Sequence, residues 1–164
     1  MDRFQYPDGG TDVRQVVVHP GAVAIIAHDE RFLYMVRQPR EPVEETALLE
    51  LPAGKLDKAE ETPLQCAQRE LSEEIGKSAG DWRELKSFYT SPGFATERVH
   101  LFLATELYDA PDDARARDSA TRSDAGEERI EIVQVPLDQL DSAIDGCHDA
   151  KSLVGLMMLR RLLR

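Results

Sequence analysis

Cysteine is scarce in this chain of 164 residues, which contains only Cys66 and Cys147. Two cysteines do not make a disulfide framework, so a reducing, cytoplasmic setting is the expected one. The N-terminal residues 1–6 lack the apolar core of a signal peptide. No apolar run approaches the ~20 residues that cross a bilayer. These absences predict a cytoplasmic protein with no membrane partner.

Positive charge is also in short supply, because 20 lysines and arginines stand against 31 acidic residues and the formal net charge is −11. A general nucleic-acid binder normally carries a basic surface, so no nucleic-acid partner is expected. A nucleotide substrate stays compatible with this charge, since a bound metal ion can supply the positive charge. The sequence also lacks a repeat or a linker, and its length suits a single domain over residues 1–164.

The most informative segment is residues 54–76, which reads as a loop followed by a short helix. Thr62 is a favourable N-cap, Pro63 suits the first helical position, and Gln65 completes a capping box. Gly76 fits the C′ position at which the helix would end. Apolar residues recur at steps of three and four, namely Leu64, Ala67, Leu71 and Ile75. The helix is expected to pack through this stripe.

Three carboxylates lie beside the stripe, because Glu70, Glu73 and Glu74 fall within roughly a 100° arc of the helix. Like charges at this spacing oppose each other by a few tenths of a kcal/mol per pair, and Arg69 offsets only part of the repulsion. A divalent cation would relieve it, since hard cations such as Mg²⁺ take oxygen ligands. The helix alone leaves both a solvated acidic face and a metal site open.

Together with its loop, this segment resembles the Nudix box: Gly, five residues, Glu, seven residues, then Arg-Glu-apolar-x-Glu-Glu-x-Gly-apolar. The second half matches residues 69–76, Arg-Glu-Leu-Ser-Glu-Glu-Ile-Gly. Counting from Gly54 makes Glu60 the box glutamate, whereas counting back from the arginine makes it Glu61, with one extra loop residue. Lys77 stands at the final apolar position. Loops tolerate insertions, so the extra residue does not weaken the match. On this match the chain is identified as a member of the Nudix superfamily.

The rest of the chain predicts strands and two further helices around the box. Apolar runs and alternation predict strands at 16–18, 21–27, 32–37, 47–51, 82–89, 99–104 and 130–135. Helices are expected at about 137–144 and after Asp149, the last with Leu153, Leu156, Met157 and Leu162 inward. This order is α+β, and the resemblance implies the Nudix fold, a mixed β-sheet sandwiched between α-helices.

Segments that flank the box resemble the ADP-ribose pyrophosphatase branch of the superfamily. They are residues 19–25 (His-Pro-Gly-Ala-Val-Ala-Ile), 36–40 (Val-Arg-Gln-Pro-Arg), 49–55, 91–97 and 149–151 (Asp-Ala-Lys). The resemblance implies metal-dependent hydrolysis of the pyrophosphate bond of ADP-ribose to AMP and ribose 5-phosphate. The alternatives are hydrolysis of another nucleoside-diphosphate sugar or a nucleoside triphosphate, and a non-catalytic ADP-ribose-binding sensor. The intact Arg69 and its glutamates argue against the sensor.

The resemblance also assigns roles near the box. It makes Glu70, Glu74, an auxiliary Glu73 and the carbonyl of Ala53 ligands of Mg²⁺, Mn²⁺ or another divalent cation. Arg69 would orient the glutamates, and it is counted with Glu73 among the catalytic residues.

A general base must reach a water within about 3 Å. Acids at the end of the polar segment 109–128 are the candidates for that base, namely Glu127 and Glu128, and Glu97 is the next one. Disordered acidic surface is an equal interpretation of this segment.

Substrate-binding candidates lie in the flanking segments, and they are Arg37, Arg40, Glu50, Gly54, Phe94 and Glu97. Arginine suits bidentate contact with phosphate, although two arginines near a strand end are often plain surface charges. The Phe94 ring would either stack on a substrate ring or pack. The branch typically pairs subunits, so a homodimer is expected in which residues 1–18 form an N-terminal arm or strand at the interface.

Overall fold

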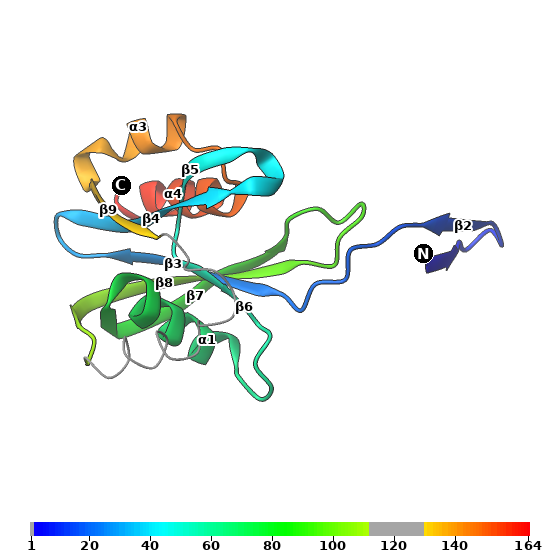
Figure 1. Ribbon diagram of the computed structural model, residues 1–164, viewed down its shortest axis with the longest axis horizontal. Coiled ribbons are helices and arrows are strands. Elements are labelled where there is room, and N and C mark those ends of the chain that lie inside the picture. Colours follow the sequence, from blue (N-terminus) through cyan, green and yellow to red (C-terminus); the bar gives the residue numbers. More distant parts are fainter. Residues whose placement is uncertain (1, 112–129) are drawn as a thin grey trace.

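The computed structural model describes residues 2–111 and 130–164, and a seven-stranded mixed sheet is its centre (Figure 1). The strands of this sheet are β3 (Ala22–His28), β4 (Phe32–Arg40), β5 (Glu45–Glu50), β6 (Ala53–Lys55), β7 (Lys77–Tyr89), β8 (Arg98–Asp109) and β9 (Glu131–Pro136). The main order is β5-β4-β3-β8-β7, while β6 pairs with β3 and β9 pairs with β4. Strand β3 runs parallel to β8 and antiparallel to β4 and β6.

Helices cover both faces of the sheet, so the predicted α+β sandwich is confirmed (Figure 1). Helix α1 (Pro63–Glu70) and the π-helical turn η2 (Leu71–Ile75) lie on one side. Helices α3 (Leu140–Asp145) and α4 (Ala150–Leu162) lie on the other. Short 3₁₀ turns span Glu41–Val43 and Leu137–Gln139.

Strand β3 contributes to both halves of the core because its side chains alternate between the two faces of the sheet. Val23, Ile25 and Ala27 pack with the α1 side, whereas Ala24 and Ile26 pack with the α4 side. All five are 0% exposed. An uninterrupted apolar run is the pattern expected of a strand covered on both faces, and it places β3 at the centre of the molecule.

The box helix begins and ends as its sequence predicts. Thr62 and Gln65 form the capping box, and Gly76 ends η2 with a left-handed φ of 72°. The expected apolar stripe is wrong at Leu64, which is 40% exposed, while Cys66 is buried in its place. The first turn of α1 extends past the core, so the stripe starts one turn later than the periodicity suggests.

The structure also corrects the strand that was expected at residues 16–18. These residues form no strand, and Val17 makes only an isolated bridge to Ala95. The strands that precede it are β1 (Asp2–Gln5) and β2 (Thr11–Arg14), a separate two-stranded hairpin that projects from the body (Figure 1).

Helix α4 buries Leu156 as expected, but Met157 and Leu162 are 58% and 46% exposed. Its buried face instead includes Gly155, where a Cβ would lie 2.4 Å from Leu51 Cδ1, so close packing against the β5 end sets the helix phase. None of the helices in the described part of the chain is long and apolar enough to cross a membrane.

Candidate active site

A cleft of about 840 Å³ brings most of the predicted site residues together. It lies where the end of β4, the β5–β6 connection, the box helix and the start of α4 meet. The predicted residues that line it are Arg40, Glu50, Ala53, Gly54, Arg69, Glu70, Glu73, Glu74 and Glu97. These residues come from four separate segments of the sequence, and the sheet brings them to one site.

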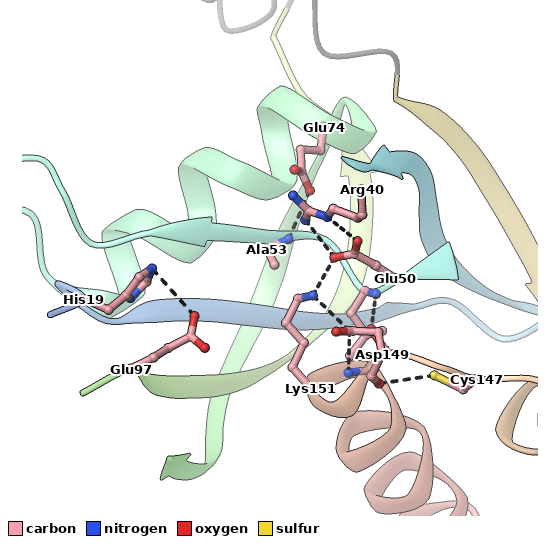
Figure 2. Close-up of polar contacts among 11 residues, drawn as sticks. His19, Arg40, Glu50, Ala53, Glu74, Glu97, Cys147, Asp149 and Lys151 are labelled. Atoms are coloured by element: carbon pink, nitrogen blue, oxygen red, sulfur yellow. Dashed lines mark hydrogen bonds and ion pairs between the residues drawn. The ribbon is translucent and has the colours of Figure 1, made fainter. Parts of the chain in front are cut away.

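The glutamates of the box helix lie under the short strand β6. Glu70 and Glu74 are 9% and 8% exposed, and Glu74 Oε2 accepts a hydrogen bond from the Ala53 backbone N–H at 3.1 Å (Figure 2). A Cβ on Gly54 would lie 2.0 Å from the carboxyl carbon of Glu70. Only glycine therefore lets β6 run this close to the helix carboxylates.

Arg69 holds the acidic cluster together through all three of its guanidinium nitrogens. Its Nε and Nη2 donate to the two oxygens of Glu61 at 2.8 and 3.0 Å, a bidentate pair. Its Nη1 donates to Glu70 at 2.6 Å and to Glu73 at 2.9 Å. The hydrogen bond from Arg69 lowers the pKa of Glu61. Glu60 is exposed with a φ of 66°, so the geometry favours Glu61 as the box glutamate.

The donor set around Glu70 suits a hard cation, although its geometry is not that of a formed metal site. Within residues 2–111 and 130–164, no group of three or more His, Cys, Asp or Glu side chains could hold a metal ion as placed. Glu70 and Glu73 are both bonded to one nitrogen of Arg69. Burial raises the pKa of Glu70 to about 7. Arg69 lowers this pKa but does not offset the burial, so a divalent cation on the carboxylate oxygens would further stabilise the ionised form.

A second charged network lies on the other side of the cleft and centres on Glu50, which is 1% exposed. Arg40 donates from Nε and Nη2 to the two Glu50 oxygens at 2.6 and 2.8 Å, and Lys151 Nζ donates to Oε2 at 2.5 Å (Figure 2). Burial raises the pKa of Glu50, but the contacts with Arg40 and Lys151 outweigh it and lower that pKa overall. Glu50 thus lies beneath the cleft as the partner of two cations.

Glu97 reaches the cleft beside a histidine that the sequence analysis did not single out as a site residue. Its Oε2 accepts a hydrogen bond from Thr90 Oγ1 at 2.6 Å, and its Oε1 lies 3.7 Å from His19 Nε2. The Gly21 N–H donates to His19 Nδ1 at 3.1 Å, which leaves Nε2 as the N–H of the neutral ring. The only sequence signal for His19 was its place in the His-Pro-Gly segment.

Two predicted substrate-binding residues lie away from this cleft. Arg37 pairs with Glu131 at 3.1 Å and lines a separate cavity of about 600 Å³. It lies three residues from Arg40, the register of β4 against β5 shifts between Gln38 and Arg40, and the two arginines line different cavities. Phe94 is 59% exposed in the turn after β7 and is not among the residues that line the cleft.

The proposed general bases Glu127 and Glu128 lie outside the described residues.

Comparison with known proteins gives consistent matches. The family model described as NUDIX domain matches residues 18–154. An ADP-ribose pyrophosphatase of Bacillus subtilis is 40% identical over 163 residues, which cover 98% of this chain and 83% of that protein. A methanol dehydrogenase activator of Bacillus methanolicus is 37% identical over the same shares of the two chains. A crystal structure of an ADP compounds hydrolase superposes with a TM-score of 0.79 at 21% identity, covering 98% of this chain and 83% of that one.

Proposed function

The chain belongs to the NUDIX domain family, and from this premise we propose that it is a pyrophosphohydrolase that converts ADP-ribose and water to AMP and ribose 5-phosphate. A relative that is 40% identical over almost the whole chain is named an ADP-ribose pyrophosphatase, which supports this substrate. The cleft volume of about 840 Å³ is also in the range of pockets that hold ligands of this size.

One observation carries the proposal: the box carboxylates and Arg40 line the same cleft. A pyrophosphate repels nucleophiles through its own negative charge, so an enzyme that cleaves it must supply positive charge near the phosphates. Arg40 provides one cation: Glu50 holds its Nε and Nη2 edge, and its remaining N–H groups can donate to phosphate oxygens. The buried carboxylates of Glu70 and Glu74 provide the place for another.

We propose that Glu70, Glu73, Glu74 and the Ala53 carbonyl hold Mg²⁺, Mn²⁺ or another divalent cation. When bound, such an ion neutralises phosphate charge and acidifies a water molecule. Arg69 keeps Glu70 and Glu73 oriented through Nη1, and Gly54 leaves room for the Glu70 carboxylate.

The proton of the attacking water needs an acceptor in the cleft. Among the described residues we propose Glu97, whose carboxylate is held by Thr90 and faces His19. Glu127 and Glu128 stay predictions for the same role. Activity lost in Glu97→Gln but kept in both Glu127→Gln and Glu128→Gln would assign the base to Glu97.

We also propose that the protein is a homodimer. The β1–β2 hairpin projects from the body, and its sheet does not join the main one (Figure 1). Phe4, Tyr6 and Val13 on this hairpin are 41%, 40% and 52% exposed, and a partner copy would cover them. A monomeric mass by light scattering at micromolar concentration, with full activity, would contradict the dimer. The cytoplasmic location and the absence of a nucleic-acid partner stay predictions.

The test of the proposed reaction is a hydrolysis assay on ADP-ribose with and without Mg²⁺, in which the products are identified. AMP and ribose 5-phosphate that form only with a divalent cation are the expected products. A nucleoside monophosphate and pyrophosphate from a nucleoside triphosphate, with ADP-ribose untouched, would assign the enzyme to another substrate. Tight binding of ADP-ribose without turnover under any divalent cation would identify a sensor.

A further inference from the structure

Lys151 lies in the wall of the cleft in the first turn of α4, outside the box and outside the predicted site residues. Its Nζ donates to Glu50 Oε2 at 2.5 Å and to Asp149 Oδ2 at 2.9 Å (Figure 2). Its side chain is 16% exposed, so the ammonium is largely removed from water. Such a lysine either contacts a ligand or holds the residues that do.

The shared partner of Lys151 is also the partner of Arg40. Both oxygens of the Glu50 carboxylate accept from Arg40, and Oε2 accepts from Lys151 as well. The carboxylate cannot rotate without breaking charge-assisted hydrogen bonds to both cations. The contact with Lys151 therefore fixes the plane of the carboxylate, and that plane fixes the Arg40 guanidinium.

Lys151 is itself held by a rigid helix start. Asp149 caps α4 by accepting from the Ser152 N–H at 3.0 Å, and it also accepts from Ser152 Oγ. Ser152 Oγ in turn accepts from the Leu51 backbone N–H at 2.7 Å, next to Glu50. The first turn of α4 is thus hydrogen-bonded both to the side chain of Glu50 and to the backbone of Leu51.

We propose that Lys151 is a positioning residue that presets Arg40, through Glu50, for contact with a phosphate group of the substrate. This inference rests on the proposed function, in which Arg40 binds the pyrophosphate. Lys151 lies between two carboxylates, which balance its charge, and only 16% of its side chain is exposed, against 43% for Arg40. Arg40 is therefore the cation presented to the cleft, and Lys151 acts from behind it.

The first test reads the position of Arg40 without any substrate. Nitrogen-15 NMR of the arginine Nε–H groups, with the Arg40 signal assigned from its loss in Arg40→Lys, reports how rigid this donor is. The Arg40 signal is expected to be rigid in the wild type and in Lys151→Arg, and mobile in Lys151→Met. Lys77→Met removes another ion-paired lysine, bonded to Asp109 at 2.8 Å outside the cleft, and is the matched control.

The second test measures ADP-ribose binding in EDTA by calorimetry, together with KM and kcat in Mg²⁺. Lys151→Met is expected to raise Kd and KM by about tenfold, with kcat within about threefold, as for loss of a charged contact that acts on binding. In the Arg40→Ala background the same substitution should change Kd by less than about twofold, because Lys151 acts through Arg40. Lys151→Arg should retain wild-type binding.

A rigid Arg40 signal in Lys151→Met would overturn the proposal. A full tenfold effect of Lys151→Met in the Arg40→Ala background would overturn it too, since Lys151 would then contact the ligand directly. If Lys151→Met does not fold, Lys151→Gln takes its place in both tests. A wild-type protein that neither binds nor cleaves ADP-ribose refutes the proposed function, while the NMR measurement still decides the positioning.

Discussion

Gly54 provides a prediction that separates activity from stability. An ideal Cβ at this position lies 2.0 Å from Cδ and Oε1 of Glu70 and 2.3 Å from its Cγ. Carbon contacts normally begin at about 3.5 Å, so alanine would displace the carboxylate by about 1.5 Å. The displaced atoms form the far end of a flexible side chain, so the backbone of β6 can stay in place.

The expected result of Gly54→Ala is a large loss of turnover in a folded protein. A misplacement of about 1 Å in a catalytic constellation can cost about 10²-fold, and kcat for ADP-ribose hydrolysis should fall by at least that factor. Overpacking costs about 1–3 kcal/mol, and each kcal/mol lowers Tm by roughly 2–4 °C in a domain of this size. The variant should therefore still melt cooperatively above the assay temperature.

The matched control is Gly146→Ala, where a Cβ would meet Ser142 O at an ordinary 3.5 Å. The assay compares kcat at saturating Mg²⁺ and ADP-ribose with the melting curve of each variant. Wild-type kcat is expected for Gly146→Ala. A Gly54→Ala protein with kcat within about threefold of wild type would show that the position of Glu70 does not control turnover.

Three further predictions concern other charged groups. Glu74→Gln should lower kcat by about 10²–10³-fold with an unchanged melting curve, and near-normal turnover at saturating Mg²⁺ would remove Glu74 from the metal site. Arg40→Ala should raise KM for ADP-ribose, whereas Arg37→Ala should leave KM unchanged because Arg37 lines the separate cavity. Equal KM values for the two variants would contradict the assignment of only Arg40 to the substrate cleft. Burial raises the pKa of Asp29, but hydrogen bonds from two backbone N–H groups and Tyr34 outweigh burial and lower this pKa overall. The ionised Asp29 therefore stabilises the fold at a pH above the unfolded-state pKa, and this stabilisation is lost as the pH falls through the folded-state pKa. In urea unfolding, Asp29→Asn should therefore be less stable than wild type at pH 7, with a gap that closes in strong acid; a gap independent of pH would contradict this.

Local interactions explain why much of the fold could be read from the sequence. The capping box at Thr62 and the left-handed Gly76 depend on neighbours within one helical turn, so residue types alone set the ends of the box helix. Strand β3 is predicted by the seven apolar or small residues in a row at 21–27, because a strand covered on both faces accommodates such a run. The carboxylates on one flank of the helix follow from its period in the same way.

Contacts between distant segments decided the rest. The sequence allowed either Glu60 or Glu61 in the box, and only the approach of the Arg69 fork across the loop selects Glu61. Leu64 and Met157 have the right helical spacing to be buried but are exposed, since the phase of a helix depends on the surface it packs against.

The cleft itself exists only in the tertiary structure. Arg37 and Arg40 cannot be told apart by residue type, and the folded strand β4, whose register against β5 shifts between Gln38 and Arg40, places them in different cavities. Glu50 and Lys151 are separated by 101 positions, and the packing of α4 on the sheet brings them to 2.5 Å. The sequence alone determined which carboxylates and cations are available and which helices and strands carry them. Their pairing was decided by burial, which makes an unpaired charge costly and so favours the contacts of Glu50 with Arg40 and Lys151 and of Glu70 with Arg69.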